Sequence, residues 1–254
     1  LLPERKVSVK DAEWQRFPSV IMTSEKIIDI LKNGKIHLSC ELFPPKQGAE
    51  LQNSLEIVNK IAASKPSYMS VTYGAGGSTV GYSAALAKKV EDNGMPALAH
   101  LTCVKADEAK LAEVLGQLQG FGVKNILALR GDIPADMQGE EIGSFAHASE
   151  LMRFVKQQGD FCVGGAAYPE GHPESGSLEK DIENTKYKVD AGVDFLVTQM
   201  FFDNTILYNY MFRLLRAGIN VPVVPGIMPV TNAKQIIRIC QLSGTKLPPQ
   251  FRAM

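Results

Sequence analysis

The segment Ser39-Cys40-Glu41-Leu42-Phe43-Pro44-Pro45 closes the first strongly apolar stretch of the chain and decides how the fold is interpreted. Residues 36–41 predict a buried strand, and no glycine fingerprint of a dinucleotide-binding sheet follows it. Burying an ionised Glu41 would cost several kcal/mol unless the carboxylate were paired or solvated. A strand-end carboxyl with a raised pKa suits proton transfer, which makes Glu41 a candidate general acid or base. The alternative is a side chain that simply reaches solvent.

Short apolar runs and longer amphipathic runs alternate along the rest of the chain, without a low-complexity linker. The predicted strands cover residues 36–41, 68–72, 97–102, 125–129, 161–167, 195–199 and 223–227. The predicted helices cover residues 51–63, 79–92, 107–119, 147–158, 178–191, 204–217 and 232–242. Strands that are apolar on both faces and joined by helices require a parallel sheet covered by helices, so the fold class is α/β.

Polar or glycine-rich clusters at the predicted strand ends distinguish between two parallel folds. The clusters are Glu41, Thr72-Tyr73-Gly74, His100-Leu101-Thr102, Arg130-Gly131-Asp132, Tyr168-Pro169-Glu170, Gln199 and Gly226. A (β/α)8 TIM barrel brings all strand ends to one mouth, whereas a doubly wound sheet concentrates its site at one switch point. We therefore predict a (β/α)8 TIM barrel. Its eighth βα unit is not found before the last residue, so we expect this unit to be missing or replaced.

A single domain is predicted for residues 22–254. Residues 1–21 are aperiodic and begin with Leu, whereas Met22-Thr23-Ser24 followed by a helical pattern is typical of a natural start. We interpret residues 1–21 as a leader, a tag or a poorly assigned segment; these residues or a partner could also fill the place of the eighth unit.

The composition predicts a cytoplasmic protein that binds neither nucleic acid nor membrane. Lys plus Arg and Asp plus Glu both total 27, so no net charge attracts a polyanion. No stretch approaches the roughly 20 apolar residues of a membrane span. The four cysteines lie far apart, which argues against a zinc site and predicts free thiols; no metal is expected.

Three of the strand-end clusters carry side chains suited to a ligand. The loop 72–79 is rich in glycine and resembles a phosphate cradle, although a tight turn also explains it. Arg130 could face a phosphate or a ring and Asp132 could bind a heterocycle, or the two could pair with each other. In the loop 168–174, Tyr168 and His172 are candidates for stacking on a cofactor, while a metal site there fits no familiar spacing. The amide of Gln199 suits recognition of an amide-bearing heterocycle.

Together these motifs resemble the 5,10-methylenetetrahydrofolate reductase family. The resemblance rests on Glu41-Leu42-Phe43-Pro44-Pro45, Val71-Thr72-Tyr73-Gly74-Ala75, His100-Leu101-Thr102-Cys103, Ala128-Leu129-Arg130-Gly131-Asp132, Ala167-Tyr168-Pro169-Glu170, His172-Pro173 and Thr198-Gln199-Met200-Phe201-Phe202-Asp203. It runs from about residue 22 to the end of the chain, and it implies a flavin-dependent (β/α)8 barrel. One departure is Tyr187, which precedes Lys188 where relatives can carry Arg.

The resemblance also implies an activity and a set of site residues. The activity is the reduction of 5,10-methylenetetrahydrofolate to 5-methyltetrahydrofolate by NADH or NADPH, in a ping-pong cycle through FAD. Glu41 would be the general acid, Asp132 would act at the flavin and pterin edge, and the pterin would be bound by Asp132, Gln199 and Gln235. The implied FAD contacts are Thr72, Tyr73, Ala75, His100, Arg130, Gly131, Asp132, Ala148, Tyr168, His172, Asp181, Asn184 and Lys188.

Two rival functions differ from this one in class. A barrel aldolase would need a Schiff-base lysine inside a strand, and none of the predicted strands has an interior lysine. A non-catalytic flavin- or folate-binding subunit would receive electrons from another protein, and turnover by the isolated chain would exclude it. The family resemblance also leads us to expect a homo-oligomer.

Overall fold

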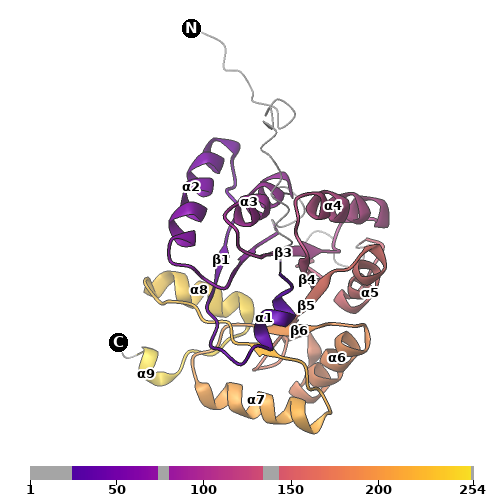
Figure 1. Ribbon diagram of the computed structural model, residues 1–254. Helices are drawn as coiled ribbons and strands as arrows, with labels where there is room; N and C mark the ends of the chain where they lie inside the picture. The colour runs from indigo at the N-terminus through magenta and orange to yellow at the C-terminus, as the bar shows by residue number, and fades with distance from the viewer. Residues whose placement is uncertain (1–24, 74–79, 134–142, 253–254) are drawn as a thin grey trace.

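A computed structural model of the protein describes residues 25–73, 80–133 and 143–252 (Figure 1). Its strands form one parallel sheet in which each strand lies beside its neighbour in sequence, in the order β1 to β7. The strands are β1 (Ser39–Leu42), β2 (Tyr68–Val71), β3 (Ala97–Thr102), β4 (Asn125–Leu129), β5 (Cys162–Ala167), β6 (Phe195–Thr198) and β7 (Val223–Val224). This uninterrupted order is that of a barrel, because a doubly wound sheet reverses its order at a switch point. The predicted α/β class and barrel arrangement are confirmed, with seven βα units in the described residues, one fewer than a full (β/α)8 barrel has.

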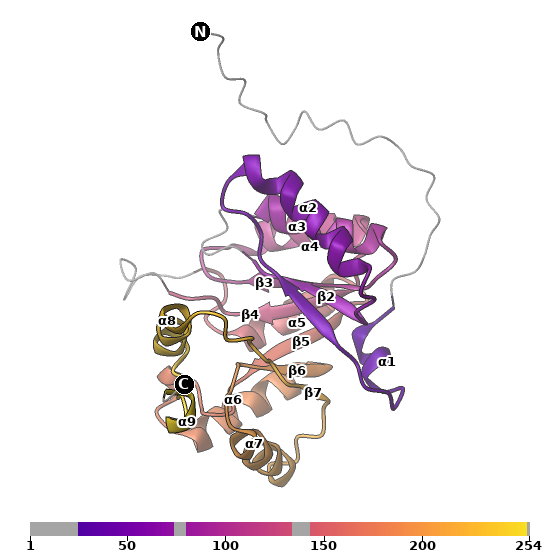
Figure 2. The same cartoon turned by 90° about the vertical axis from the view of Figure 1, so that its left-hand side faces the viewer.

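Helices follow the strands and cover the outer face of the curled sheet, except α1 (Ile27–Leu31), which lies at its amino-terminal end (Figure 2). The others are α2 (Leu51–Ala62), α3 (Val80–Asp92), α4 (Glu108–Gly120), α5 (Ala148–Gln158), α6 (Leu178–Asp190), α7 (Asn204–Arg216), α8 (Ala233–Ser243) and α9 (Pro249–Arg252), with short 3-10 helices η2 (Gly48–Glu50) and η5 (Pro173–Ser175). Several of these helices begin at a side-chain cap, as α4 does at Asp107, whose carboxylate accepts a hydrogen bond from the backbone amide of Lys110 at 2.7 Å. Within the described residues no helix has the length and apolar character needed to cross a membrane.

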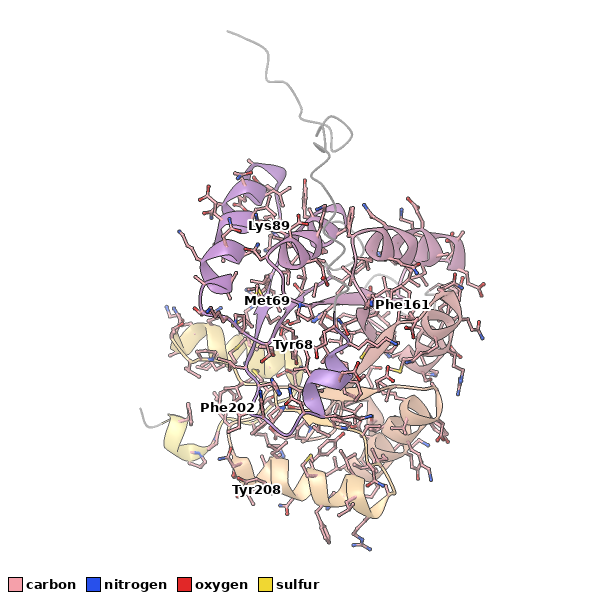
Figure 3. The ribbon with its side chains drawn as sticks, viewed as in Figure 1. Tyr68, Met69, Lys89, Phe161, Phe202 and Tyr208 are labelled. Atoms are coloured by element: carbon pink, nitrogen blue, oxygen red, sulfur yellow. The ribbon has the colours of Figure 1, made fainter. Side chains whose placement is uncertain are left out.

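The side chains of each strand alternate between two apolar cores. In β2, Met69 belongs to the core between sheet and helices, whereas Tyr68 belongs to a smaller core inside the barrel (Figure 3). The smaller core is formed by Ile27, Tyr68, Leu98, Leu127, Cys162 and Phe195. It fills the barrel at the amino-terminal ends of the strands, which leaves the carboxyl-terminal ends free to carry polar groups.

Helix α1 closes the amino-terminal end of the barrel. Asn125, the fully buried first residue of β4, accepts a hydrogen bond from the amide of Ile27 at 2.8 Å and donates to the carbonyl of Glu25 at 3.2 Å. Ile27 is itself fully buried in the inner core. A buried amide side chain therefore fixes the position of α1, and the inner core is sealed from solvent at that end.

The two edge strands are shorter than predicted. The structure begins β1 at Ser39 instead of residue 36, and both Ile36 and Leu38 are largely exposed. Likewise β7 ends at Val224 instead of residue 227, and Ile227 is 79% exposed. The prediction of longer strands was wrong because it took these apolar residues to be buried. An edge strand has a neighbouring strand on one side only, so its ends are not covered. The expected free thiols are confirmed for all four cysteines.

Gly164 in β5 gives a test of the inner core. A Cβ added there would lie 2.8 Å from the Phe195 ring and 3.0 Å from Leu127, so Gly164→Ala should destabilise the fold by about 1–3 kcal/mol through overpacking. Gly116, on the exposed face of α4, has nothing within 4 Å, so Gly116→Ala should stabilise by about 0.5–1 kcal/mol. Urea unfolding of both variants measures the difference, and equal shifts in the same direction would contradict this packing.

Candidate functional site

A cavity of about 1070 Å³ opens at the carboxyl-terminal ends of the strands. Parallel strands joined by helices bring these ends together, so side chains far apart in sequence line one space. The lining includes every residue predicted to contact FAD except Ala75, which lies outside the described residues: Thr72, Tyr73, His100, Arg130, Gly131, Asp132, Ala148, Tyr168, His172, Asp181, Asn184 and Lys188. The predicted residues Glu41, Gln199 and Gln235 do not line it.

Glu41 and His100 form part of a polar layer above the inner core. Glu41 is level with Ser70 in the β1–β2 register, and Ser70 lies two residues after the inward-facing Tyr68, so both side chains face into the barrel. His100 likewise lies two residues after the inward-facing Leu98 and is almost fully buried. Burial lowers the pKa of His100 to about 4, so its imidazole is neutral at pH 7.

Glu41 has the protonation behaviour that its position in the sequence predicted. The residue is exposed, and its side chain lies on the inner face of β1, beside the cavity and outside its lining. Desolvation raises the pKa of its carboxyl, so the acid form persists to higher pH than in a free glutamate. Phe43, two residues further on, does line the cavity, which places Glu41 close to its rim.

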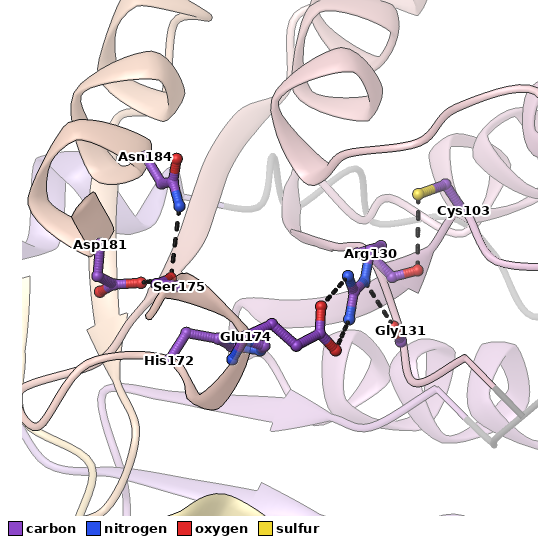
Figure 4. A network of polar contacts seen from close by, with 8 residues as sticks. All are labelled: Cys103, Arg130, Gly131, His172, Glu174, Ser175, Asp181 and Asn184. Atoms are coloured by element: carbon purple, nitrogen blue, oxygen red, sulfur yellow. Dashed lines mark hydrogen bonds and ion pairs between the residues drawn. The ribbon is translucent and has the colours of Figure 1, made fainter. Parts of the chain in front are cut away.

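Arg130 joins two walls of the cavity. Its terminal nitrogens donate to the two carboxylate oxygens of Glu174 at 2.6 and 2.7 Å, and its Nε donates to the carbonyl of Gly131 (Figure 4). The pairing raises the pKa of Arg130 and lowers that of Glu174. The ion-pair partner of Arg130 is thus Glu174, and not Asp132 as one reading of the Arg-Gly-Asp motif allowed.

Gly131 makes a turn that a side chain would block. Its φ of +89° lies in the left-handed region, and an added Cβ would lie 3.1 Å from the Cβ of Thr102. The glycine therefore allows the backbone after β4 to pass close to β3 while Arg130 and Asp132, on either side of it, both line the cavity.

A polar cluster from α6 and η5 lines the other side. Ser175 donates from Oγ to Oδ1 of Asp181 at 3.0 Å and accepts from Nδ2 of Asn184 at 3.4 Å. The second carboxylate oxygen of Asp181 is buried and has no hydrogen-bond partner. Asp181, Asn184 and Lys188 follow one another on one face of α6, as their spacing of three and four residues requires. Within this cluster, Oδ2 of Asp181 is therefore an acceptor without a donor.

Lys188 and two rings complete this side of the cavity. The Lys188 ammonium donates to the carbonyl of Ala166 at 2.7 Å and lies 5.6 Å from the centre of the Tyr168 ring. Burial lowers the pKa of Lys188, although nearby Asp181 opposes this shift. The rings of Tyr168 and His172 meet edge to face at 4.7 Å, and burial raises the pKa of Tyr168 to about 12. Both rings therefore stand fixed and uncharged at pH 7, with the pKa of His172 lowered by burial.

Gln199 and Gln235, two of the predicted residues that do not line the cavity, lie at the end of β6 and at the start of α8. The Gln199 side chain accepts a hydrogen bond from the amide of Met200 at 2.9 Å, at the end of β6. Gln235 is exposed in the first turn of α8, where Asn232 accepts from its amide. Asp132, predicted for both flavin and pterin, is the member of the predicted folate-binding set that lies in the cavity.

Glu174 and Ser175 are residues of this site that the sequence analysis did not predict as ligand contacts. Glu174 was covered only by the metal site weighed for the loop 168–174, and Ser175 lies just beyond that loop. In the described residues no group of three His, Cys, Asp or Glu side chains is arranged to hold a metal ion. Pro173 at the first position of η5 was the available signal, because a proline there fixes the backbone at the start of a helical turn.

Comparison with known proteins gives the family. The family model described as methylenetetrahydrofolate reductase matches residues 26–254. The 5,10-methylenetetrahydrofolate reductase of Escherichia coli strain K12 is 36% identical over 222 residues, which cover 87% of this chain and 74% of that protein. The methylenetetrahydrofolate reductase (NADH) 1 of Zea mays is 35% identical over 243 residues, which cover 90% of this chain and 41% of that protein.

Solved structures show the same fold at low sequence identity. An uncharacterised protein from Clostridium thermocellum, described as binding two copies of 5-methyl-5,6,7,8-tetrahydrofolic acid, matches with a TM-score of 0.56 and 13% identity, over 87% of this chain and 76% of that one. A 2,3-dimethylmalate lyase matches with a TM-score of 0.55 and 12% identity, over 84% and 76%. These two likenesses concern the fold alone. The family match and the relatives above 30% identity show that this chain belongs to the methylenetetrahydrofolate reductase family of oxidoreductases.

Proposed function

We propose that this chain reduces 5,10-methylenetetrahydrofolate to 5-methyltetrahydrofolate with NADH as the electron donor and FAD as the bound cofactor. The reaction on the folate follows from family membership, and the name of the maize relative supports NADH. The observation that carries the cofactor is a single cavity lined by every described residue of the predicted FAD set. NADPH or a partner protein as donor, a homo-oligomeric state and a cytoplasmic location remain predictions.

The chemistry of the cavity fits a flavin dinucleotide. A volume of about 1070 Å³ stands at the upper end of the roughly 300–1,000 Å³ of ligand pockets. The unpartnered oxygen of Asp181 suits a hydroxyl or amine donor, and Arg130 suits a phosphate. The faces of Tyr168 and His172 offer stacking surfaces. When bound, FAD would supply two-electron redox chemistry, taking hydride from the nicotinamide and giving it to the folate in a ping-pong cycle.

Glu41 is the proposed acid for the folate. Its proton would go to N10 of the five-membered ring, and the bond from N10 to the bridging carbon would break. The bridging carbon would then form an iminium with N5, and hydride addition at that carbon would give the methyl group. The nearby Asp132 carboxylate would stabilise the positive iminium, while Gln199 and Gln235 are proposed to bind the pterin.

The visible spectrum of the purified chain tests the proposed function. With FAD added, we expect a bound-flavin band that bleaches under anaerobic NADH and returns on addition of methylenetetrahydrofolate. The catalytic proposal would be refuted if neither NADH nor NADPH bleached the flavin band, or if the bleached band did not return on addition of the folate. Bleaching only in the presence of a reduced partner protein would favour the alternative of a partner-dependent flavin-binding subunit.

Asp181→Asn tests the cofactor part of the proposal. The change keeps the size of the side chain but removes the buried negative charge, and we expect FAD affinity to fall by about tenfold to a hundredfold through loss of a charge-assisted hydrogen bond. Asp190→Asn, at the exposed end of the same helix, is the matched control and should leave affinity unchanged. Fluorescence titration with FAD measures both. Equal affinities for the two variants would contradict the role of Asp181.

Glu41→Gln separates the two half-reactions. We expect the folate half-reaction to slow by about 10²- to 10⁴-fold because the acid is gone, while NADH still bleaches the flavin at the normal rate. In the unaltered protein the folate step should slow as pH rises through the raised pKa of Glu41, since only the protonated form acts. Anaerobic stopped-flow measurements give both rates. Normal folate turnover by the variant would exclude Glu41 as the acid.

A further inference from the structure

The guanidinium of Arg130, which an anionic ligand would bind, is already bound to Glu174. Both terminal nitrogens of Arg130 face the Glu174 carboxylate, and its Nε faces the carbonyl of Gly131. The two residues are 44 positions apart, so the pair links the end of β4 to η5 across the cavity wall (Figure 4). An anionic group that approaches this guanidinium therefore meets a bidentate partner already in place.

The other charges of the cavity do not supply a free excess of positive charge. Its described lining holds three cationic side chains and three anionic ones, which are Lys46, Arg130, Lys188, Asp132, Glu174 and Asp181. The ammonium of Lys188 already donates to a backbone carbonyl. A diphosphate would thus enter a space with no formal net charge, unless one of the carboxylates moved away.

Glu174 is the carboxylate that holds Arg130, and its position lets it move away. Its side chain is 58% exposed, whereas Asp181 is buried and held by Ser175. It lies on the three-residue helix η5, between Gly171 and Gly176, whose φ values of +85° and +74° place a left-handed turn on either side. Rotation of Glu174 towards solvent would leave its carboxylate hydrated, so little desolvation opposes the movement.

We propose that Glu174 is a displaceable counterion of Arg130, which the anionic diphosphate of a ligand must replace. The proposal rests on the proposed function, because FAD is the ligand that brings the diphosphate. Glu174 then makes the affinity depend on the charge of the ligand. It lowers the affinity for an anionic flavin, which must displace it from Arg130. It does not affect a neutral flavin, because a neutral flavin leaves the ion pair intact. If Glu174 instead only oriented Arg130 for the ligand, its presence would raise the affinity for FAD, and its removal would lower that affinity.

The sign of the change in affinity is the test. We expect Glu174→Gln to bind FAD about threefold to tenfold more tightly than the unaltered protein, since an exposed ion pair no longer competes. Riboflavin, which lacks phosphate, should bind equally to both. The matched control is Glu179→Gln, which removes an exposed Arg–Glu pair of 2.7 Å on α6 and α7, away from the cavity, and should change neither affinity. Fluorescence titration measures all the affinities, and Glu174→Ala serves if the glutamine variant does not fold.

Two further measurements separate this proposal from the proposed function. In an Arg130→Gln background the Glu174→Gln change should no longer strengthen FAD binding, because the guanidinium for which Glu174 and the diphosphate compete is absent. Inorganic pyrophosphate, titrated calorimetrically into the flavin-free protein, should also bind more tightly to Glu174→Gln. Weaker or unchanged binding of pyrophosphate to that variant would overturn the counterion role. Failure of the unaltered protein to bind FAD would overturn the proposed cofactor, while the pyrophosphate result would still decide the role of Glu174.

Discussion

The parallel alignment of all the strands is the constraint on which the rest of the structure depends. Because every strand runs the same way and returns through an outer helix, the carboxyl-terminal ends meet at one mouth. The inner face of each strand must then change from apolar to polar along its length. In β3 this change takes two residues, from the buried Leu98 of the inner core to His100 in the cavity.

The polar side of the barrel is built from groups that are costly to bury. His100 is neutral because burial lowers its pKa to about 4, and the ammonium of Lys188 has one backbone carbonyl and one aromatic ring close by. One oxygen of Asp181 has no donor at all. Each of these groups is costly to bury without a full set of partners, and a ligand that supplied partners would offset that cost. Binding of such a ligand would therefore raise the stability of the protein through the same side chains.

The sequence predicted the central part of the fold more accurately than its edges. The bounds of β3 and β4 were predicted correctly, because their apolar runs are covered by neighbours on both sides. The segments predicted as edge strands carry equally apolar residues, such as Ile36 and Ile227, which lie beyond the ends of β1 and β7. Burial there depends on a neighbouring strand that no local pattern encodes.

The sequence predicted those site residues that come directly after a strand. Arg130 and Asp132 directly follow β4, so their place at the mouth was predicted from the barrel alone. The partner of Arg130 was not, because Glu174 lies 44 residues away and its contact depends on the geometry of η5. The loop residue Ala75 and residues 1–21 lie outside the described residues, so those predictions stand as they were made.

The consecutive order of the strands also bears on how the chain folds. In the described residues each strand pairs with the strand that precedes or follows it in sequence, so every pairing closes a loop of similar, moderate length. The entropy lost on closing a loop grows only slowly with its length, and no pairing here requires the two ends of the chain to find each other first. The topology therefore allows assembly to begin at any adjacent pair of βα units and to extend in both directions.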